Sequence, residues 1–246
     1  MTAAFDPDAA SARIVEVLVP LGTPQRAMQE KRYLKSGLDF LGVTVPDTRR
    51  VVVAAVREHP GLDRDDAIAW ALALWREPVH ERRMAAIEVL RLQVRALRPA
   101  DLPTVERLIR EALSWALVDP LAADIAGKIV LAHPGGWPRI DNWAADEDFW
   151  VRRSALLSLL PGIRADQPDL ARFSRYATPL LDEKEFFIRK AIGWVLREIS
   201  KKDPAFVAAY TQQHLHAMSG VTFREAVRRL PAAQVTHLTA TRAPRP

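Results

Sequence analysis

The chain has no cysteine among its 246 residues. This absence excludes disulfide bonds, metal sites built from thiolates, and a cysteine nucleophile. A protein that uses none of these is suited to a reducing compartment, so we expect a cytoplasmic location.

Long apolar runs are also absent. No stretch approaches the roughly 20 residues that a membrane-spanning helix requires. The first residues, MTAAFDPDAASARIVEVLVPLG, begin with acids and have no basic region ahead of their apolar part. We therefore expect no targeting segment, no membrane anchor and no membrane partner.

Alternation with period two, which is typical of half-buried strands, is almost missing. Nearly every segment instead has helical periodicity, for example ASARIVEVLV at 10–19, ERRMAAIEVLRLQV at 81–94 and FFIRKAIGWVLREI at 186–199. Prolines and short polar breaks separate these segments. We predict an all-α protein in which residues 1–230 form a single repeat domain. Residues 231–246 lose the periodicity and are expected to form a frayed tail.

The helical segments recur at a regular spacing. TRRVVVAAV, ERRMAAIEVL, VRRSALLSLL, IRKAIGWVL and FREAVRRL place arginines at 49, 82, 152, 189 and 224, with gaps of 33, 70, 37 and 35 residues. A unit of roughly 35 residues and two helices is typical of solenoids of the HEAT or TPR type. We predict a curved solenoid of HEAT-like antiparallel helix pairs with one concave basic groove. The arginines expected near the N-terminal ends of helices facing this groove are Arg49, Arg82, Arg152 and Arg189.

One repeat carries an acid where the others carry arginine. The gap of 70 holds two units, and the missing position, 37 residues after Arg82 and 33 before Arg152, is Asp119. Its surroundings read SWALVDPLA from Ser114 to Ala122. Local signals favour Asp119 as the N-cap of a helix that starts at Pro120. Alternatively Ser114 is the N-cap, Trp115 and Asp119 share one face, and Pro120 interrupts the helix.

The balance of charge points toward an anionic partner. The chain has 35 Lys+Arg and 30 Asp+Glu, a formal net charge of +5, which is compatible with nucleic acid. A lone carboxylate in a groove that binds phosphates weakens binding unless it meets a cation. A purine alkylated at N3 or N7 is such a cation. A carboxylate about 4 Å from the charge that develops as its glycosidic bond breaks contributes roughly 4 kcal/mol at an effective dielectric near 20, about a thousandfold in rate. Trp115 would add a cation–π contact.

Four segments resemble one family. They are YLKSGLDFLGVTVPDTRR (33–50), SWALVDPLA (114–122), FWVRRSALLSLL (149–160) and EFFIRKAIGWVLREISKKDP (185–204), and they are similar to the AlkD family of bacterial DNA alkylation-repair glycosylases. The resemblance extends from about Arg32 to about Leu230. It implies a HEAT-like solenoid that binds duplex DNA and removes 3-methyladenine and 7-methylguanine in base excision repair, with no cofactor and no metal. It further implies a cytoplasmic, bacterial-type monomer that associates with the nucleoid when it binds DNA.

The resemblance also implies roles for individual residues. Asp119 matches the catalytic aspartate, and Trp115 and Trp194 match two tryptophans that pack against the deoxyribose of the lesion. Arg153 matches an arginine beside the DNA backbone, and Tyr33 matches an aromatic residue near the site. Two positions differ from the family pattern: some members carry a second tryptophan at the place of Ser114, and a proline directly after the acid is unusual.

Further DNA contacts follow from the repeat register. The candidates are Lys35, Arg152, Arg189 and Lys190, for which the alternative is an ordinary solvated charge. His214 and His216 do not share a helix face and have no third ligand nearby, so we expect no metal site. HPGGWP is not followed by GK[ST], which argues against a phosphate-binding loop. Two rival functions remain: a protein of the same fold that binds damaged or branched DNA without chemistry, and a scaffold for protein interactions.

Overall fold

The computed structural model describes residues 5–242. Within that range the regular structure is helical, and the one departure is an isolated parallel bridge between Asp39 and Val79. The predicted all-α class is confirmed. The residues cluster into two compact units, Met1–Ile129 and Val130–Pro246.

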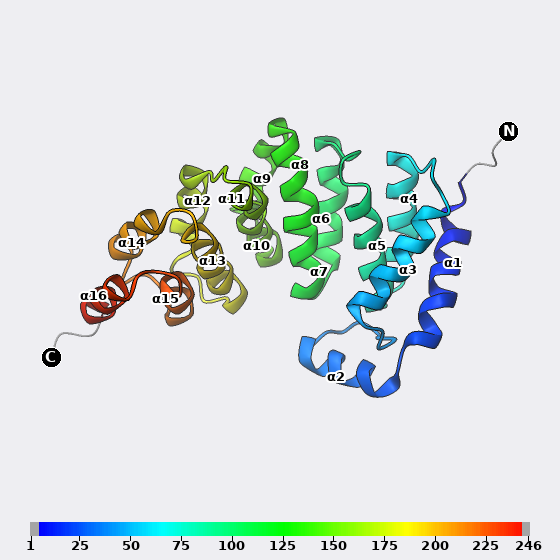
Figure 1. Cartoon of the computed structure of the whole chain (residues 1–246), viewed down its shortest axis with the longest axis horizontal. Coiled ribbons are helices and arrows are strands. Elements are labelled where there is room, and N and C mark those ends of the chain that lie inside the picture. Colours follow the sequence, from blue (N-terminus) through cyan, green and yellow to red (C-terminus); the bar gives the residue numbers. More distant parts are fainter. Residues whose placement is uncertain (1–4, 243–246) are drawn as a thin grey trace. The chain divides into compact units, whose positions relative to one another are not determined.

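The first unit is built from helices joined by short loops (Figure 1). Its elements are α1 (Pro7–Leu18), a 3₁₀ turn (Val19–Leu21), α2 (Pro24–Leu34), α3 (Val45–Arg57), α4 (Arg64–Trp75), α5 (His80–Leu92), a 3₁₀ turn (Pro99–Asp101), α6 (Leu102–Glu111), α7 (Trp115–Pro120), a π-helical segment (Leu121–Ala126) and the start of α8 (Gly127–Ala132).

The second unit is also built from helices joined by short loops. Its elements after α8 are a 3₁₀ turn (Pro134–Gly136), α9 (Trp137–Trp143), α10 (Phe149–Leu157), α11 (Leu160–Arg164), α12 (Leu170–Ala177), a 3₁₀ turn (Thr178–Leu180), α13 (Phe186–Ile199), α14 (Pro204–Gln213), α15 (Gly220–Val227) and α16 (Ala232–Arg242). The expectation of a frayed tail is wrong for Ala232–Arg242, because these residues form α16 and bury Leu238. Residues 243–246 lie outside the described range.

The packing within each unit follows the repeat. In the first unit α4 packs on α5, and α5 also contacts α3 and α7; in the second, α9 packs on α10, and α13 contacts both α10 and α15. These partners lie side by side in Figure 1. Helices α3, α5, α7, α10, α13 and α15, called here the row helices, are those that carry the repeated arginine or Asp119. Apolar stripes on both members of each pair supply the core, which includes Trp70 in the first unit and Trp143, Phe173 and Tyr176 in the second.

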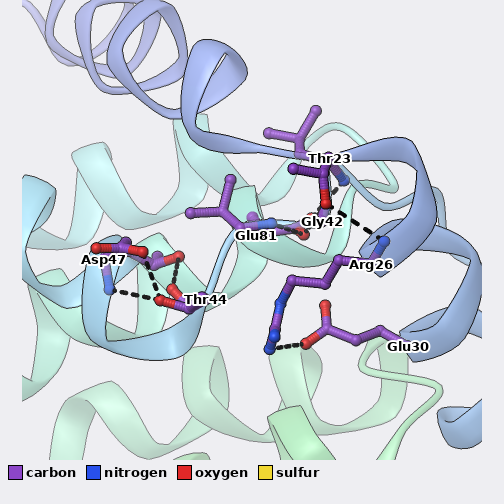
Figure 2. Close-up of polar contacts among 10 residues, drawn as sticks. Thr23, Arg26, Glu30, Gly42, Thr44, Asp47 and Glu81 are labelled. Carbon is purple, nitrogen blue, oxygen red and sulfur yellow. Dashed lines mark hydrogen bonds and ion pairs between the residues drawn. The ribbon is translucent and has the colours of Figure 1, made fainter.

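A buried carboxylate fixes the loop between α2 and α3. Glu81, in the first turn of α5 and only 1% exposed, accepts hydrogen bonds from the backbone N–H groups of Leu41, Gly42 and Val43 at 2.9, 2.7 and 3.1 Å. Gly42 has a φ of 78°, and a Cβ there would stand 2.2 Å from the carbonyl oxygen of Thr23. Figure 2 shows this cluster beside the Arg26–Glu30 ion pair of α2. Since a buried charge is tolerated only when it is well bonded, these three bonds hold the loop in one conformation.

Candidate functional site

The start of α7 decides where Asp119 lies. Ser114 has extended backbone angles (φ −160°, ψ 137°), and its side chain accepts from the N–H of Ala116 at 3.3 Å. Ser114 is therefore the N-cap and Trp115 the first helical residue. Asp119 is the fifth residue of α7, inside the helix, so the cap interpretation of Asp119 is wrong. Trp115 and Asp119, four residues apart, share one helix face.

Pro120 interrupts the helix directly after Asp119. A proline has no N–H to donate to the carbonyl four residues earlier, here Ala116. The chain then changes to π-helical hydrogen bonding over Leu121–Ala126, where the N–H of Gly127 donates to the carbonyl of Ala122. Short π-helical segments inside α-helices are frequent at functional sites. Both irregularities follow Asp119, which itself lies within the α-helical turns of α7.

The structure brings Tyr33 and Trp115 together. Their ring centroids are 6.1 Å apart at an interplanar angle of 83°, an edge-to-face contact. Tyr33 is 73% exposed on α2, and Trp115 is half-buried. Lys35, two residues after Tyr33, is exposed and caps α2 in the left-handed conformation with a φ of 48°. The side of the first unit that carries Asp119 therefore also has two aromatic rings and a nearby lysine.

The repeat register holds at the level of helix positions. Arg49 is the fifth residue of α3, Arg82 the third of α5, Arg152 and Arg189 the fourth of α10 and α13, and Arg224 the fifth of α15. The predicted location near helix N-termini is confirmed for the first four arginines, whereas Arg224 lies in the last turn of the short helix α15. Asp119 occupies the equivalent place in α7.

Several of these cations bind acidic groups and carbonyls of the protein. Arg152 pairs with Glu183 at 3.0 Å and donates to the carbonyls of Asp146 and Glu147 at 2.6 and 2.8 Å. The Nε of Arg189 donates to the carbonyl of Glu183 at 2.6 Å. The Arg152–Glu183 pair links α10 to the loop that precedes α13, and the other contacts join each arginine to the loop before its own helix.

Lys190 also binds a protein carboxylate. It pairs with Glu225 of α15, which also receives a hydrogen bond from Arg197. Burial by itself would raise the pKa of Glu225, but the hydrogen bond from Lys190 and the charge of Arg197 hold that pKa below its ordinary value. The carboxylate therefore stays charged and links α13 to α15.

Arg153 and Trp194 lie on two row helices of the second unit. Arg153, in α10, is 3% exposed; it donates to the carbonyl of Phe187 and lies over the Phe187 ring at 5.9 Å. Trp194 is half-buried on α13 next to Gly193. A Cβ on Gly193 would stand 2.6 Å from the Cβ of Glu225, so the glycine permits the close approach of α15.

The sequence analysis missed two residues beside α7. Arg83, the second arginine of ERRMAAIEVL, is buried; it donates to the carbonyl of Glu111 and lies over the Trp75 ring at 4.9 Å. Leu113 has a φ of 52°, and no glycine marks this left-handed turn in the sequence. The dipeptide Arg82–Arg83 was visible as a repeat, but only the packing shows that its second member faces inward.

Within residues 5–242, helix length and hydropathy bear on a membrane span, and the grouping of possible metal ligands bears on a metal site. None of the helices there combines the length and apolar character needed to cross a membrane. Across the same range, no group of three or more histidine, aspartate or glutamate side chains is placed to hold a metal ion.

Comparison with known proteins identifies the family. The family model described as "DNA alkylation repair enzyme" matches residues 14–230, and the chain belongs to that family. No curated protein matches the chain significantly.

Solved structures agree on the fold. A predicted DNA alkylation repair enzyme from Enterococcus faecalis has a TM-score of 0.78 at 23% identity, covering 86% of this chain and 97% of its own. AlkD2 from Streptococcus mutans has a TM-score of 0.57 at 17% identity, covering 85% of this chain and 99% of its own. The protein smu.31 from Streptococcus mutans UA159 has a TM-score of 0.53 at 15% identity, covering 89% of this chain and 97% of its own.

Proposed function

We propose that the protein is a DNA glycosylase that hydrolyses the N-glycosidic bond of cationic alkylated purines, 3-methyladenine and 7-methylguanine, in duplex DNA. Beyond membership of the repair family, one structural observation supports this glycosylase activity. A single carboxylate, Asp119, occupies the helix position that holds arginine in the other row helices, and it shares a face with Trp115.

The chemistry requires only one acid. An alkylated purine leaves as a neutral base, so no second carboxyl is needed to protonate the leaving group, unlike in ordinary glycosidases. Asp119 stabilises the cationic sugar as the bond breaks and orients the water that captures it. Trp115, held by its edge contact with Tyr33, presents a π-face to the same cation.

The family resemblance and the repeat register supply the remaining residues of the proposal. Trp194 packs against the deoxyribose, and Arg153 acts beside the DNA backbone. Lys35, Arg152, Arg189 and Lys190 add positive charge for the phosphates. The net charge of +5 is consistent with a polyanionic partner.

The decisive experiment is a single-turnover excision assay with duplex DNA that contains 7-methylguanine. We expect Asp119→Asn to lower the excision rate by about two to three orders of magnitude, the size of the Coulomb interaction at roughly 4 Å. Asn keeps the shape of Asp and removes its charge. Affinity for undamaged duplex should stay the same or rise, because a negative charge is removed from a phosphate-binding surface.

A matched control lies five residues further on. Asp124, in the π-helical segment, is also half-buried and faces Lys128 at 4.0 Å. Asp124→Asn should leave the excision rate within about twofold of the unmutated rate. If Asp119→Asn excised 7-methylguanine as fast as the unmutated protein, the catalytic role of Asp119 would be refuted. Binding without excision by the unmutated protein would identify a DNA-binding protein that performs no chemistry.

A further inference from the structure

The linker between α6 and α7 has an unusual middle residue. It consists of Ala112, Leu113 and Ser114; Ala112 is fully buried and Ser114 is 2% exposed, whereas Leu113 is 57% exposed. Leu113 also has a φ of 52°, in the left-handed region. A leucine is unfavourable there, since its Cβ crowds the following carbonyl.

The backbone on both sides of Leu113 is anchored. The carbonyl of Glu111 accepts a hydrogen bond from the buried guanidinium of Arg83, and the Glu111 carboxylate accepts one from the indole of Trp75 at 2.9 Å. On the other side the hydroxyl of Ser114 caps α7. The leucine side chain is therefore presented outward from a fixed backbone.

Folding does not account for a leucine at this position. The residue after a helix C-cap is most often glycine, sometimes asparagine, because both tolerate a positive φ. An exposed leucine adds little to the core. Left-handed non-glycine residues are a recurrent feature of functional sites, where strain is retained for the side chain it presents.

Leu113 lies close in the chain to the candidate site. Leu113 is two residues before Trp115, whose ring contacts Tyr33. Lys35, two residues after Tyr33, is another of the three non-glycine residues with positive φ among residues 5–242; the third is Asp166. Each ring of the Tyr33–Trp115 contact thus has a left-handed residue two positions away in the chain, a lysine beside Tyr33 and a leucine beside Trp115.

We propose that Leu113 is a DNA-contacting residue, and that its side chain packs against the apolar surface of deoxyribose and base edges in the strand held at Trp115. This inference rests on the proposed function, because it takes DNA as the ligand of that face. Deoxyribose carbons and base edges offer apolar area, whereas phosphates do not. Leu113 is then a positioning residue that keeps the damaged nucleotide in register with Asp119.

The experiment compares Leu113→Gly and Leu113→Met in three measurements. Leu113→Gly should lower the excision rate of 7-methylguanine about tenfold, the effect of losing one apolar contact. Its Tm should not fall, and should rise by about 2 °C, because glycine relieves the backbone strain. Leu113→Met should restore the rate to within about threefold. A residue needed only for folding would lower the rate and Tm together.

The third measurement separates this inference from the proposed function. Affinity for a duplex containing a tetrahydrofuran abasic-site analogue is measured across salt concentrations, and it does not depend on excision. Leu113→Gly should weaken this affinity about fivefold to tenfold with an unchanged salt slope, since no phosphate contact is lost. If the unmutated protein failed to excise 7-methylguanine but Leu113→Gly still weakened binding in this way, the proposed function would fail while the Leu113 contact stood.

A matched control is the third left-handed residue. Asp166, in the loop after α11, has a φ of 59°, and Asp166→Gly should leave excision and DNA affinity unchanged. The Leu113 proposal is overturned if Leu113→Gly excises and binds like the unmutated protein. It is equally overturned if Leu113→Met behaves like Leu113→Gly, or if Tm and rate fall together.

Discussion

At the scale of single residues, competition between two N-caps decides the geometry of the candidate site. Asp119 followed by Pro120 is a good local signal for a helix start. The helix nevertheless begins at Trp115, five residues before Pro120, because Ser114 is an equally good cap and the first turn buries Leu117 and Val118 completely. Burial of two apolar side chains contributes more than a cap, roughly 3–6 kcal/mol against about 1 kcal/mol.

The two candidate tryptophans should matter less than Asp119. We expect Trp115→Ala and Trp194→Ala each to slow excision of 7-methylguanine by about twofold to thirtyfold, because a cation–π contact is worth about 0.5–2 kcal/mol. The same single-turnover assay measures the effect. Trp115→Phe keeps an aromatic face and should recover most of the rate. A loss larger than that of Asp119→Asn would contradict the assigned order of importance.

Another residue-scale prediction concerns pH and stability. The rings of His80 and Phe40 are stacked, with their centroids 4.7 Å apart. Burial lowers the pKa of His80, and this effect exceeds the opposite effect of the charge of Glu81. The unfolded state therefore binds a proton more readily than the folded state. The contribution of neutral His80 to the free energy of unfolding is therefore fully present above the pKa of the unfolded state, about 6.5. It is lost as the pH falls toward the lower pKa of the folded state.

Denaturant unfolding at pH 5, 6 and 7 tests this sign. From pH 7 to pH 5, the free energy of unfolding should fall more in the unmutated protein than in His80→Gln, by at most about 1.4 kcal/mol per pH unit. The difference between the two proteins removes the contribution of the carboxylates that also titrate in acid. Parallel pH curves would show that His80 titrates alike in both states.

At the scale of elements, α2 is held in an unusual way. None of its residues is buried, so hydrophobic packing does little to hold it in place. Its position follows from polar contacts: Thr23 caps it and donates its N–H to the carbonyl of Gly42, and Glu81 binds the loop that contains Gly42 (Figure 2). The helix that presents Tyr33 to Trp115 therefore depends on one buried carboxylate.

Removal of the Glu81 charge tests that dependence. Glu81→Gln leaves one acceptor oxygen for three N–H donors and places an amide N–H₂ against one of them. We expect the free energy of unfolding to fall by about 2–4 kcal/mol and Tm by about 5–10 °C, as measured by calorimetry. The exposed Glu77 supplies the control: Glu77→Gln should shift Tm by less than about 2 °C. Equal stability of the two variants would show that the loop is held by other contacts.

At the scale of the whole molecule, the net charge of +5 predicts that binding to DNA depends on salt. If affinity rests on phosphate contacts, log K should fall with log salt by about 0.9 per phosphate neutralised. Lys35→Ala should reduce this slope by about one unit, since Lys35 is exposed. Fluorescence anisotropy with a labelled duplex between 50 and 200 mM salt measures the slope. Lys184→Ala is the control, because Lys184 lies among the acids Asp182, Glu183 and Glu185. Binding that does not depend on salt would instead favour a protein-interaction scaffold.

Substitution of Arg153 would change stability as well as DNA affinity, so Arg153 suits the salt experiment less well than Lys35. Its guanidinium is buried and bonded to the Phe187 carbonyl. Truncation removes a buried, hydrogen-bonded side chain from the contact between α10 and α13, which costs about 1–3 kcal/mol of stability. Arg153→Ala should therefore lower Tm as well as affinity, and Arg153→Lys should lower Tm less.

The sequence by itself determined the helical class, the repeat of about 35 residues, and the place of Asp119 in the repeat where the other units carry arginine; that Asp119 lies inside α7 was decided by the structure. These features depend on periodicity and spacing, which the order of residues states directly. Ring contact between Tyr33 and Trp115, the inward direction of Arg83 and Arg153, the left-handed turn at Leu113 and the helix at Ala232–Arg242 were decided only by the tertiary structure. Each depends on which distant residues pack around it, and such burial overrides local preferences that are worth only about 1 kcal/mol.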